Sequence, residues 1–166
     1  MEAVGEGGEA GRTRWGYRPS SAAPGGLALS DPLLFAWEEG IEETLEAVVP
    51  RMLGTTTVGG GAEIGVFWEV YGVARDEEFD LSVAMIPENR GVFRRLGEAL
   101  RILQRSSSIE FTWREAPGEE AIAGRALRLD LSRLDPGRYS FQVSARNAGG
   151  DEVVTSRPME IFGENR

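Results

Sequence analysis

Ile64-Gly-Val-Phe-Trp-Glu-Val-Tyr-Gly-Val73 is the most apolar stretch of the chain, and it is rich in β-branched and aromatic residues. Residues of these kinds pack well on a buried, pleated strand and lose side-chain freedom in a helix. In a strand the side chains alternate between two faces, and Glu69 indicates that its face is the wetter one. The opposite face carries the residues Ile64, Val66, Trp68 and Val70. We therefore predict a central strand that places Trp68 in the core of a β-sandwich.

The composition limits the classes of protein that this chain can belong to. A chain of 166 residues is expected to form one domain, and it needs no disulfide or metal to fold. It contains no cysteine and no histidine, which removes thiol chemistry, the usual general base and the commonest metal ligand. All 18 basic residues are arginines, so Schiff-base chemistry and a P-loop lysine are excluded as well.

The charge balance argues against two classes of partner. Acidic residues outnumber basic ones by 27 to 18, for a net charge of −9. Nucleic acids and anionic membrane surfaces attract concentrated positive charge, so neither is expected as the main partner. No window of 18 consecutive apolar residues is present, so no membrane insertion is expected. The acidic first residues do not resemble a signal peptide, which fits a cytoplasmic protein or, as we favour, a piece of a longer chain.

Three regions are expected along the chain. Residues 1–26 hold Gly, Glu, Ser and Pro with almost no aliphatic residues, so we expect a disordered or loosely docked lead. Trp15 and Tyr17 are its exceptions, and they predict either a strip that docks against the domain edge or an aromatic that binds a ligand. Residues 27–162 are expected to form the sandwich, and residues 163–166 a short tail.

Further stretches alternate between apolar and polar residues, which is typical of half-buried strands. With the central strand and the shorter apolar runs before it, they predict an all-β sandwich of about seven to nine strands. The alternating stretches are residues 79–85, 109–113, 127–131, 139–145 and 153–162.

Two stretches depart from this period. Residues 91–104 place apolar side chains at i, i+3, i+7 and i+10 with arginines between them, which predicts one short amphipathic helix inserted between strands. Residues 38–50 are ambiguous, because helical spacing and glutamates favour a helix whereas Gly40 and Pro50 leave little room for one. Here we predict a strand over Leu45–Val49, with Pro50 at a sheet edge.

The run from Leu127 to Ala145 resembles a corner of immunoglobulin-like and fibronectin type III sandwiches, where a Leu-x-Pro-Gly-x-Tyr sequence leads into an alternating strand. The matching residues here are Leu134, Pro136, Gly137 and Tyr139. The resemblance implies that Tyr139 forms a tyrosine corner, with its hydroxyl bonded to the backbone just upstream. It also implies that Trp68 is the core tryptophan of the third sandwich strand. The disulfide of antibody domains has no counterpart in this cysteine-free chain.

A second likeness is to the C-terminal sandwich of GWxTD-domain proteins, which are bacterial and thought to be exported. It covers most of residues 27–162, although the GWxTD signature itself is absent from the sequence. The resemblance implies a module of a larger bacterial protein that works outside the cytoplasm. The matching motifs are Ser30-Asp-Pro-Leu-Leu34, Val48-Val-Pro50, Glu69-Val-Tyr-Gly72 and Pro136-Gly-Arg-Tyr139.

The titratable residues form no motif of a catalytic or metal site. Without His or Cys, no Ser-His-Asp or Cys-His arrangement is possible. A carboxylate pair for glycoside hydrolysis stays formally possible, but the acids fall at turns and on outward strand positions. Calcium is the metal to consider, yet the acidic clusters at residues 38–46 and 76–80 do not resemble an EF-hand loop. We expect no catalytic residue, no cofactor and no metal.

Carbohydrate binding is the alternative that the aromatic residues leave open, since sugars stack on exposed rings. Alternation turns Trp68 and Trp113 inward as structural residues, so Trp15 and Trp37 are the candidate ligand contacts. We predict a non-catalytic accessory or protein-interaction module whose sheet edges or loops meet a protein partner or a neighbouring domain. A carbohydrate-binding module and a small carboxylate-dependent hydrolase are the alternatives.

Overall fold

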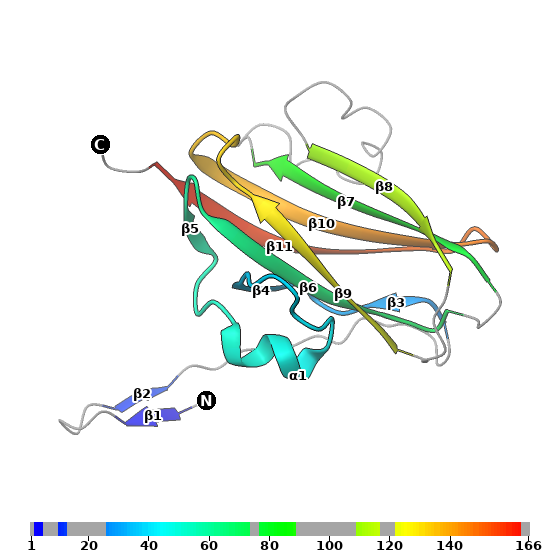
Figure 1. Ribbon diagram of the computed structural model, residues 1–166, viewed down its shortest axis with the longest axis horizontal. Coiled ribbons are helices and arrows are strands. Elements are labelled where there is room, and N and C mark those ends of the chain that lie inside the picture. Colours follow the sequence, from blue (N-terminus) through cyan, green and yellow to red (C-terminus); the bar gives the residue numbers. More distant parts are fainter. Residues whose placement is uncertain are drawn as a thin grey trace.

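The computed structural model describes residues 2–4, 10–12, 26–73, 77–88, 109–116 and 122–163. The sandwich part consists of two facing sheets with one short helix packed on the outside (Figure 1). The predicted all-β class is therefore confirmed. Within these ranges, no helix combines the length and the apolar character needed to cross a membrane.

The smaller sheet is built around the stretch predicted as the central strand. Its strands are β3 (Ala28–Leu29), β4 (Leu33–Ala36), β6 (Glu63–Tyr71) and β9 (Ile122–Asp130). β6 pairs antiparallel with β9 along one side and with β3 and β4, end to end, along the other. Ser30 keeps the chain on β6 between β3 and β4, because its N–H donates to the Glu69 carbonyl at 2.9 Å and its hydroxyl accepts from the Glu69 N–H at 2.9 Å.

The larger sheet faces the smaller one with five strands. In order across the sheet they are β5 (Thr57–Gly59), β11 (Glu152–Phe162), β10 (Gly137–Asn147), β7 (Phe79–Pro87) and β8 (Ile109–Glu115). Neighbours are antiparallel except β5, which runs parallel to the end of β11. In the described part of the chain β8 pairs only with β7 and β9 only with β6, so each is a free edge of its sheet.

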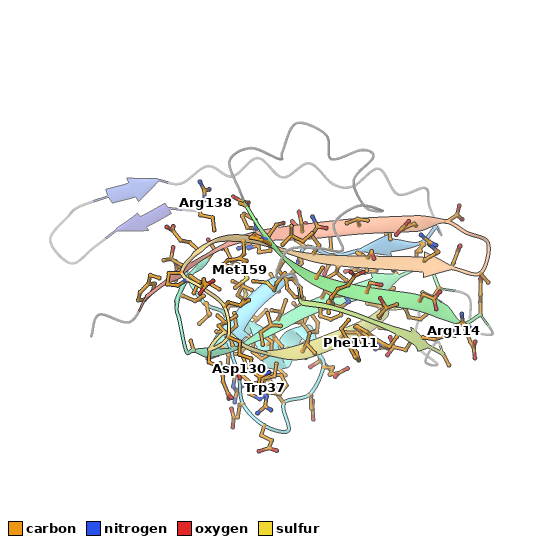
Figure 2. All side chains as sticks on the ribbon, turned by 90° about the horizontal axis from the view of Figure 1, so that it is seen from above. Trp37, Phe111, Arg114, Asp130, Arg138 and Met159 are labelled. Carbon is orange, nitrogen blue, oxygen red and sulfur yellow. The ribbon has the colours of Figure 1, made fainter. Side chains whose placement is uncertain are left out.

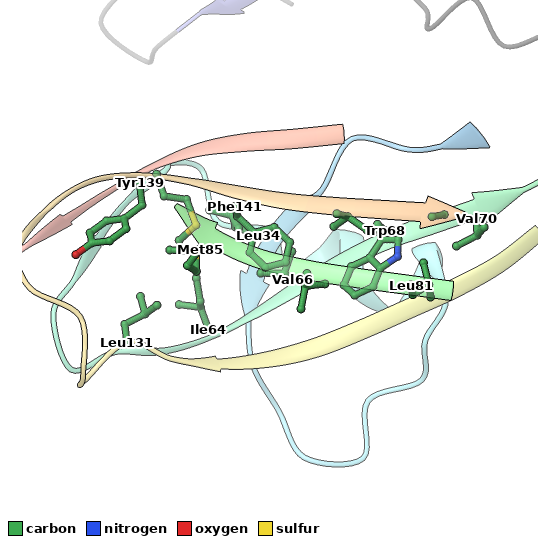
Figure 3. Packing of buried hydrophobic residues seen from close by; sticks show 14 of the residues in the cluster. Leu34, Ile64, Val66, Trp68, Val70, Leu81, Met85, Leu131, Tyr139 and Phe141 are labelled. Carbon is green, nitrogen blue, oxygen red and sulfur yellow. The ribbon is translucent and has the colours of Figure 1, made fainter. Parts of the chain in front are cut away.

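A continuous core fills the space between the sheets (Figure 3). Trp68 has 1% of its surface exposed, and its ring centroid lies 6.4 Å from that of Phe141 and 6.5 Å from that of Trp113. Trp113 is half-buried, so both tryptophans face inward as the alternation predicts. Each large side chain buried in this way contributes about 1.5–3 kcal/mol. Other members of the core include Leu34, Ile64, Val66, Leu81, Met85 and Leu131.

The outer face of the smaller sheet is covered as well over much of β6, but Glu69 and Tyr71 are only half-buried, so this face is the wetter of the two, as predicted. A second hydrophobic cluster, which we call the outer cluster, lies there, and its fully buried members are Phe35, Val48 and Phe67. Two glycines leave room for this layer. A Cβ built on Gly65 would lie 2.2 Å from the Phe35 ring, and one built on Gly124 would lie 2.0 Å from the Glu43 carbonyl oxygen.

The segment that covers this face is helical, so the predicted strand over residues 45–49 is wrong. Thr44 starts the helix, because its hydroxyl accepts a bond from the Ala47 N–H at 3.3 Å and thereby caps a free N-terminal donor. Pro50 falls at the start of the following turn, where a missing N–H is tolerated. Burial of Val48 in the second cluster then outweighs its β propensity. The segment comprises α1 (Leu45–Val48) and the 3₁₀ turn η1 (Val49–Arg51).

Several predictions fall partly or wholly outside the described residues. The amphipathic helix predicted over residues 91–104 is one of them, and Trp15 and Tyr17 are others. Within the first 26 residues, two short strands pair antiparallel with each other. They are β1 (Glu2–Val4) and β2 (Ala10–Arg12).

Candidate interaction site

The turn that leads into β10 is held by the residues on which the family resemblance rests. The Tyr139 hydroxyl donates to the Asp135 carbonyl oxygen at 2.8 Å. Burial, helped by the nearby Asp135 carboxylate, raises the pKa of Tyr139. Leu134 packs at the edge of the core, while Pro136 is exposed in the turn and Gly137 begins β10. These contacts give the turn a structural role.

Trp37, one of the two candidate ligand contacts, is packed against the outer cluster. It follows β4 directly and is half-buried (Figure 2). Its ring centroid lies 6.0 Å from that of Phe35, at an interplanar angle of 41°. Part of the Trp37 ring is thus used in holding the helical segment on the sheet. The other candidate, Trp15, lies outside the described residues, so the structure does not bring the two together.

Some members of the two acidic clusters are bonded to arginines or to backbone. Glu38 accepts from the Arg51 Nε at 2.9 Å, and Asp80 accepts from the Arg114 Nε at 3.0 Å. Glu77 accepts from a backbone N–H of the turn between β10 and β11 at 2.9 Å. Exposed pairs of this kind contribute roughly 0–1 kcal/mol. No group of three or more acidic side chains in the described ranges is arranged to hold a metal ion.

The side of the sandwich between β8 and β9 is open. Because β3 and β4 share one edge of β6, the smaller sheet is three strands wide and faces a sheet of five strands. Phe111 lies on the inner face of β8, two residues before Trp113, and yet 59% of its surface is exposed (Figure 2). Its ring centroid lies 5.5 Å from that of Trp113. On β9 the inward-facing Leu127 and Leu129 are likewise left half-buried.

An ion pair connects the two sheets at one end of the open side between β8 and β9. Arg125 lies opposite Trp68 on the inner face of β9, and its Nε donates to Glu115 Oε1 at 2.6 Å. The same guanidinium donates to the Gly124 carbonyl at 2.6 Å. The side chains of Arg125 and Glu115 are 20% and 22% exposed, so solvent screens this pair less than a fully exposed one. Phe111 lies four residues before Glu115, toward the end that remains open.

Phe111 is the functional candidate that sequence reasoning missed. The alternation of residues 109–113 assigns it to the inner face, which is the face it occupies. Its exposure depends on how many strands the opposite sheet contributes, and no pattern within β8 carries that information. Only knowledge of which strands pair would have predicted that Phe111 is exposed.

Two comparisons of this sequence with known proteins give no match. No protein-family model matches it, and a search of curated proteins gives no match.

Proposed function

We propose that this protein is a non-catalytic interaction module that binds an extended segment of a protein partner along β8. The observation that carries the proposal is Phe111, the most exposed large apolar side chain of the described residues, located on an edge strand of the larger sheet. A partner strand that pairs with β8 would satisfy the free backbone groups of the edge and cover Phe111 at the same time. Covering a phenylalanine that is half exposed contributes about 1–2 kcal/mol.

The outer face of β8 forms a polar border to this contact. Glu110, Thr112 and Arg114 are exposed there. The Thr112 hydroxyl lies 2.8 Å from that of Ser82, and Arg114 is bonded to Asp80, so both side chains are anchored on β7. Charges of both signs on an edge strand discourage pairing with unrelated strands. A partner with a complementary sequence is still able to bind.

We infer that the sandwich is immunoglobulin-like. In the constant-type arrangement the first, second, fourth and fifth strands share one sheet, and the third, sixth and seventh share the other. Here the fourth strand, β8, lies in the second of these sheets. The pairing of β4, β6 and β9 and that of β7, β10 and β11 support this assignment, with β3 and β4 counted as one broken strand and the short β5 set aside. The bond from Tyr139 to Asp135 supports a tyrosine corner. Trp68 departs from the resemblance, because its strand is the second and not the third.

The sequence supports a role without catalysis in a larger assembly. It lacks histidine, cysteine and lysine, which are the usual general bases, nucleophiles and Schiff-base residues. The likeness to the exported bacterial GWxTD-domain proteins extends the proposal to a module of a larger bacterial protein outside the cytoplasm.

Carbohydrate binding is the second candidate, because Phe111 and Trp113 form an aromatic pair at the open side. Their ring planes are tilted by 34°, and 59% of the surface of Phe111 is exposed. A sugar would stack on this exposed ring. The protein partner is favoured because two tilted rings do not form a flat platform, whereas the edge of β8 offers backbone groups along its whole length.

Selection from a peptide library displayed on phage tests the proposal. We expect extended peptides rich in β-branched and aromatic residues, whose binding shifts the amide resonances of β8. Phe111→Asp should abolish their binding. Val154→Asp is the matched control, because it places the same charge at a valine that is 49% exposed on β11, and it should leave binding intact.

Two outcomes would count against the proposed site. Peptides that bind both variants equally well would place the contact elsewhere on the molecule. If no peptide is selected, and a glycan array gives binding that depends on Phe111, the carbohydrate-binding module replaces the protein-interaction module.

A further inference from the structure

The helical segment carries an apolar stripe that faces solvent. Leu45, Val49 and Met52 are 37%, 49% and 43% exposed. Leu45 begins α1, Val49 begins η1 and Met52 follows η1 as its C-cap, and their spacing of four and three residues places them on one side of this segment. Val48 is the α1 side chain that is buried in the outer cluster. Packing of the helix on the sheet therefore does not require Leu45, Val49 or Met52. We call Leu45, Val49 and Met52 the α1 stripe.

Negative charge borders the α1 stripe. Residues 38–51 contain five glutamates against a single arginine, which gives a formal charge of −4. That arginine, Arg51, is already bonded to Glu38, while Glu42 and Glu46 are exposed. Such a surface fits a helix that presents large apolar residues between basic ones. Apolar contact then supplies affinity, and opposite charge orients the partner and rejects others.

The same chain contains a segment of this chemistry. Residues 90–105, which lie outside the described ranges, contain five arginines against one glutamate, for a formal charge of +4. So positive a segment is unusual in a chain whose net charge is −9. Its large apolar residues recur at helical spacing. They are Phe93, Leu96, Leu100 and Leu103.

We propose that the α1 stripe binds residues 90–105 of a second copy of the chain. The described residues on either side of this segment, Glu88 and Ile109, follow β7 and begin β8 in the larger sheet. α1 covers the outer face of the smaller sheet, on the opposite side of the sandwich (Figure 1). This placement favours a contact between two molecules over a contact within one. It does not depend on the proposed binding along β8.

The geometry of the contact has a consequence for assembly. Because the stripe and the segment are different patches, a one-way contact joins molecules head to tail and builds rings or open chains. Reciprocal contacts between two copies close a two-fold dimer instead. Self-association is then expected to grow with protein concentration and to weaken as salt screens the opposite charges.

Two variants that each lose one half of the interface test the proposal. L45S/V49S removes the stripe and keeps the segment, whereas L96S/L100S removes the segment and keeps the stripe. In sedimentation experiments the wild-type protein should associate as its concentration rises, and each variant alone should stay monomeric. An equimolar mixture of the two should form a one-to-one complex, since each supplies the half that the other lacks.

Charge-reversal variants give an independent readout. E42R/E46R and R94E/R95E should each weaken association at least about tenfold. Reversal at the exposed Glu160 of β11 is the matched control and should change nothing. Circular dichroism of every variant verifies that it remains folded.

Three results would overturn the inference. These are a wild-type protein that is monomeric at every concentration, a mixture of the half-interface variants that stays monomeric, and association that persists in both variants alone. Phe111→Asp in the same assay separates the two proposals. It should leave self-association unchanged while abolishing the binding of peptides along β8.

Discussion

The Tyr139 hydroxyl ties β10 to the turn that precedes it, through its bond to the Asp135 carbonyl. In Tyr139→Phe the ring keeps its packing and only this bond is lost, so we expect the free energy of unfolding to fall by about 1 kcal/mol. Urea denaturation measures the change. Asp135→Ala keeps the carbonyl acceptor and is the control, with an expected change below about 0.5 kcal/mol. A Tyr139→Phe variant as stable as the wild type would show that the bond contributes nothing to stability.

The same hydroxyl predicts a loss of stability at alkaline pH. Burial raises the pKa of Tyr139 above its ordinary value of 10.0, and the Asp135 carboxylate adds to the shift. As the pH rises above 10.0, the unfolded chain releases this proton while the folded chain retains it, so stability falls as the pH passes through the folded-state pKa. The stability difference between wild type and Tyr139→Phe should therefore narrow over this range in urea denaturation. A difference that stays constant contradicts the assignment.

Two glycines of the smaller sheet make room for the helical layer. In Gly65→Ala the new Cβ would lie 2.2 Å from the buried Phe35 ring, and in Gly124→Ala it would lie 2.0 Å from the Glu43 carbonyl oxygen. We expect each variant to lose about 1–3 kcal/mol of unfolding free energy. Gly54→Ala is the matched control, because no atom lies within 4 Å of its Cβ position, and its stability should stay within about 0.5 kcal/mol of the wild type. Thermal or urea denaturation compares the three.

The elements of the structure vary in how strongly local residues determine them, and α1 has one local determinant, the side-chain cap at its start. Thr44→Ala removes the oxygen that accepts from the Ala47 N–H, and we expect a loss of about 1 kcal/mol. Amide hydrogen exchange at Ala47 and Val48 should accelerate by a corresponding factor. Thr44→Ser retains a hydroxyl acceptor and should behave like the wild type. Unchanged exchange in Thr44→Ala would mean that packing alone holds the helix.

Most strands could be predicted from the sequence because alternation reports directly on a half-buried sheet. This holds for β6, β7 and β10, whose inward residues are those that the pattern selects. The strand predicted over residues 45–49 is wrong, because the local signals of residues 38–50 conflict. Thr44 and Pro50 fit the start of helical turns, whereas Val48 and Val49 favour a strand. Burial of Val48 in the outer cluster decides the outcome, and that contact is not local.

At the scale of the whole molecule, the candidate site arises from the unequal widths of the two sheets. The inward direction of Phe111 follows from its strand, but its exposure follows from the narrower sheet opposite. β3 and β4 share one edge of β6, and β5 adds to the larger sheet beside β11. These long-range pairings leave no mark in any single stretch of sequence. Trp37 is a similar case. Its place directly after a strand predicts a free ring, but the ring packs against the outer cluster.

β6 also contributes to both cores. Its inner face carries Trp68, and its outer face carries Phe67, which packs in the cluster that holds Phe35 and Trp37. Because the two clusters share this strand, the sandwich is expected to unfold in a single transition. Phe67→Leu removes atoms from the outer cluster alone, and we expect it to lower the free energy of unfolding of the whole sandwich by about 1–2 kcal/mol.

Two fluorescent reporters check this cooperativity. In one variant Trp68 is the sole tryptophan and reports on the inner core, and in the other Trp37 is the sole tryptophan and reports on the outer cluster. We expect their urea transitions to coincide and Phe67→Leu to shift both by the same amount. Val154→Ala, at an exposed position of β11, should shift neither. A Trp37 transition that moves to lower urea while the Trp68 transition stays in place would show that the helical layer opens independently. The segment that carries the α1 stripe would then fold independently of the sandwich. Its binding of a second copy would be independent of the sandwich as well.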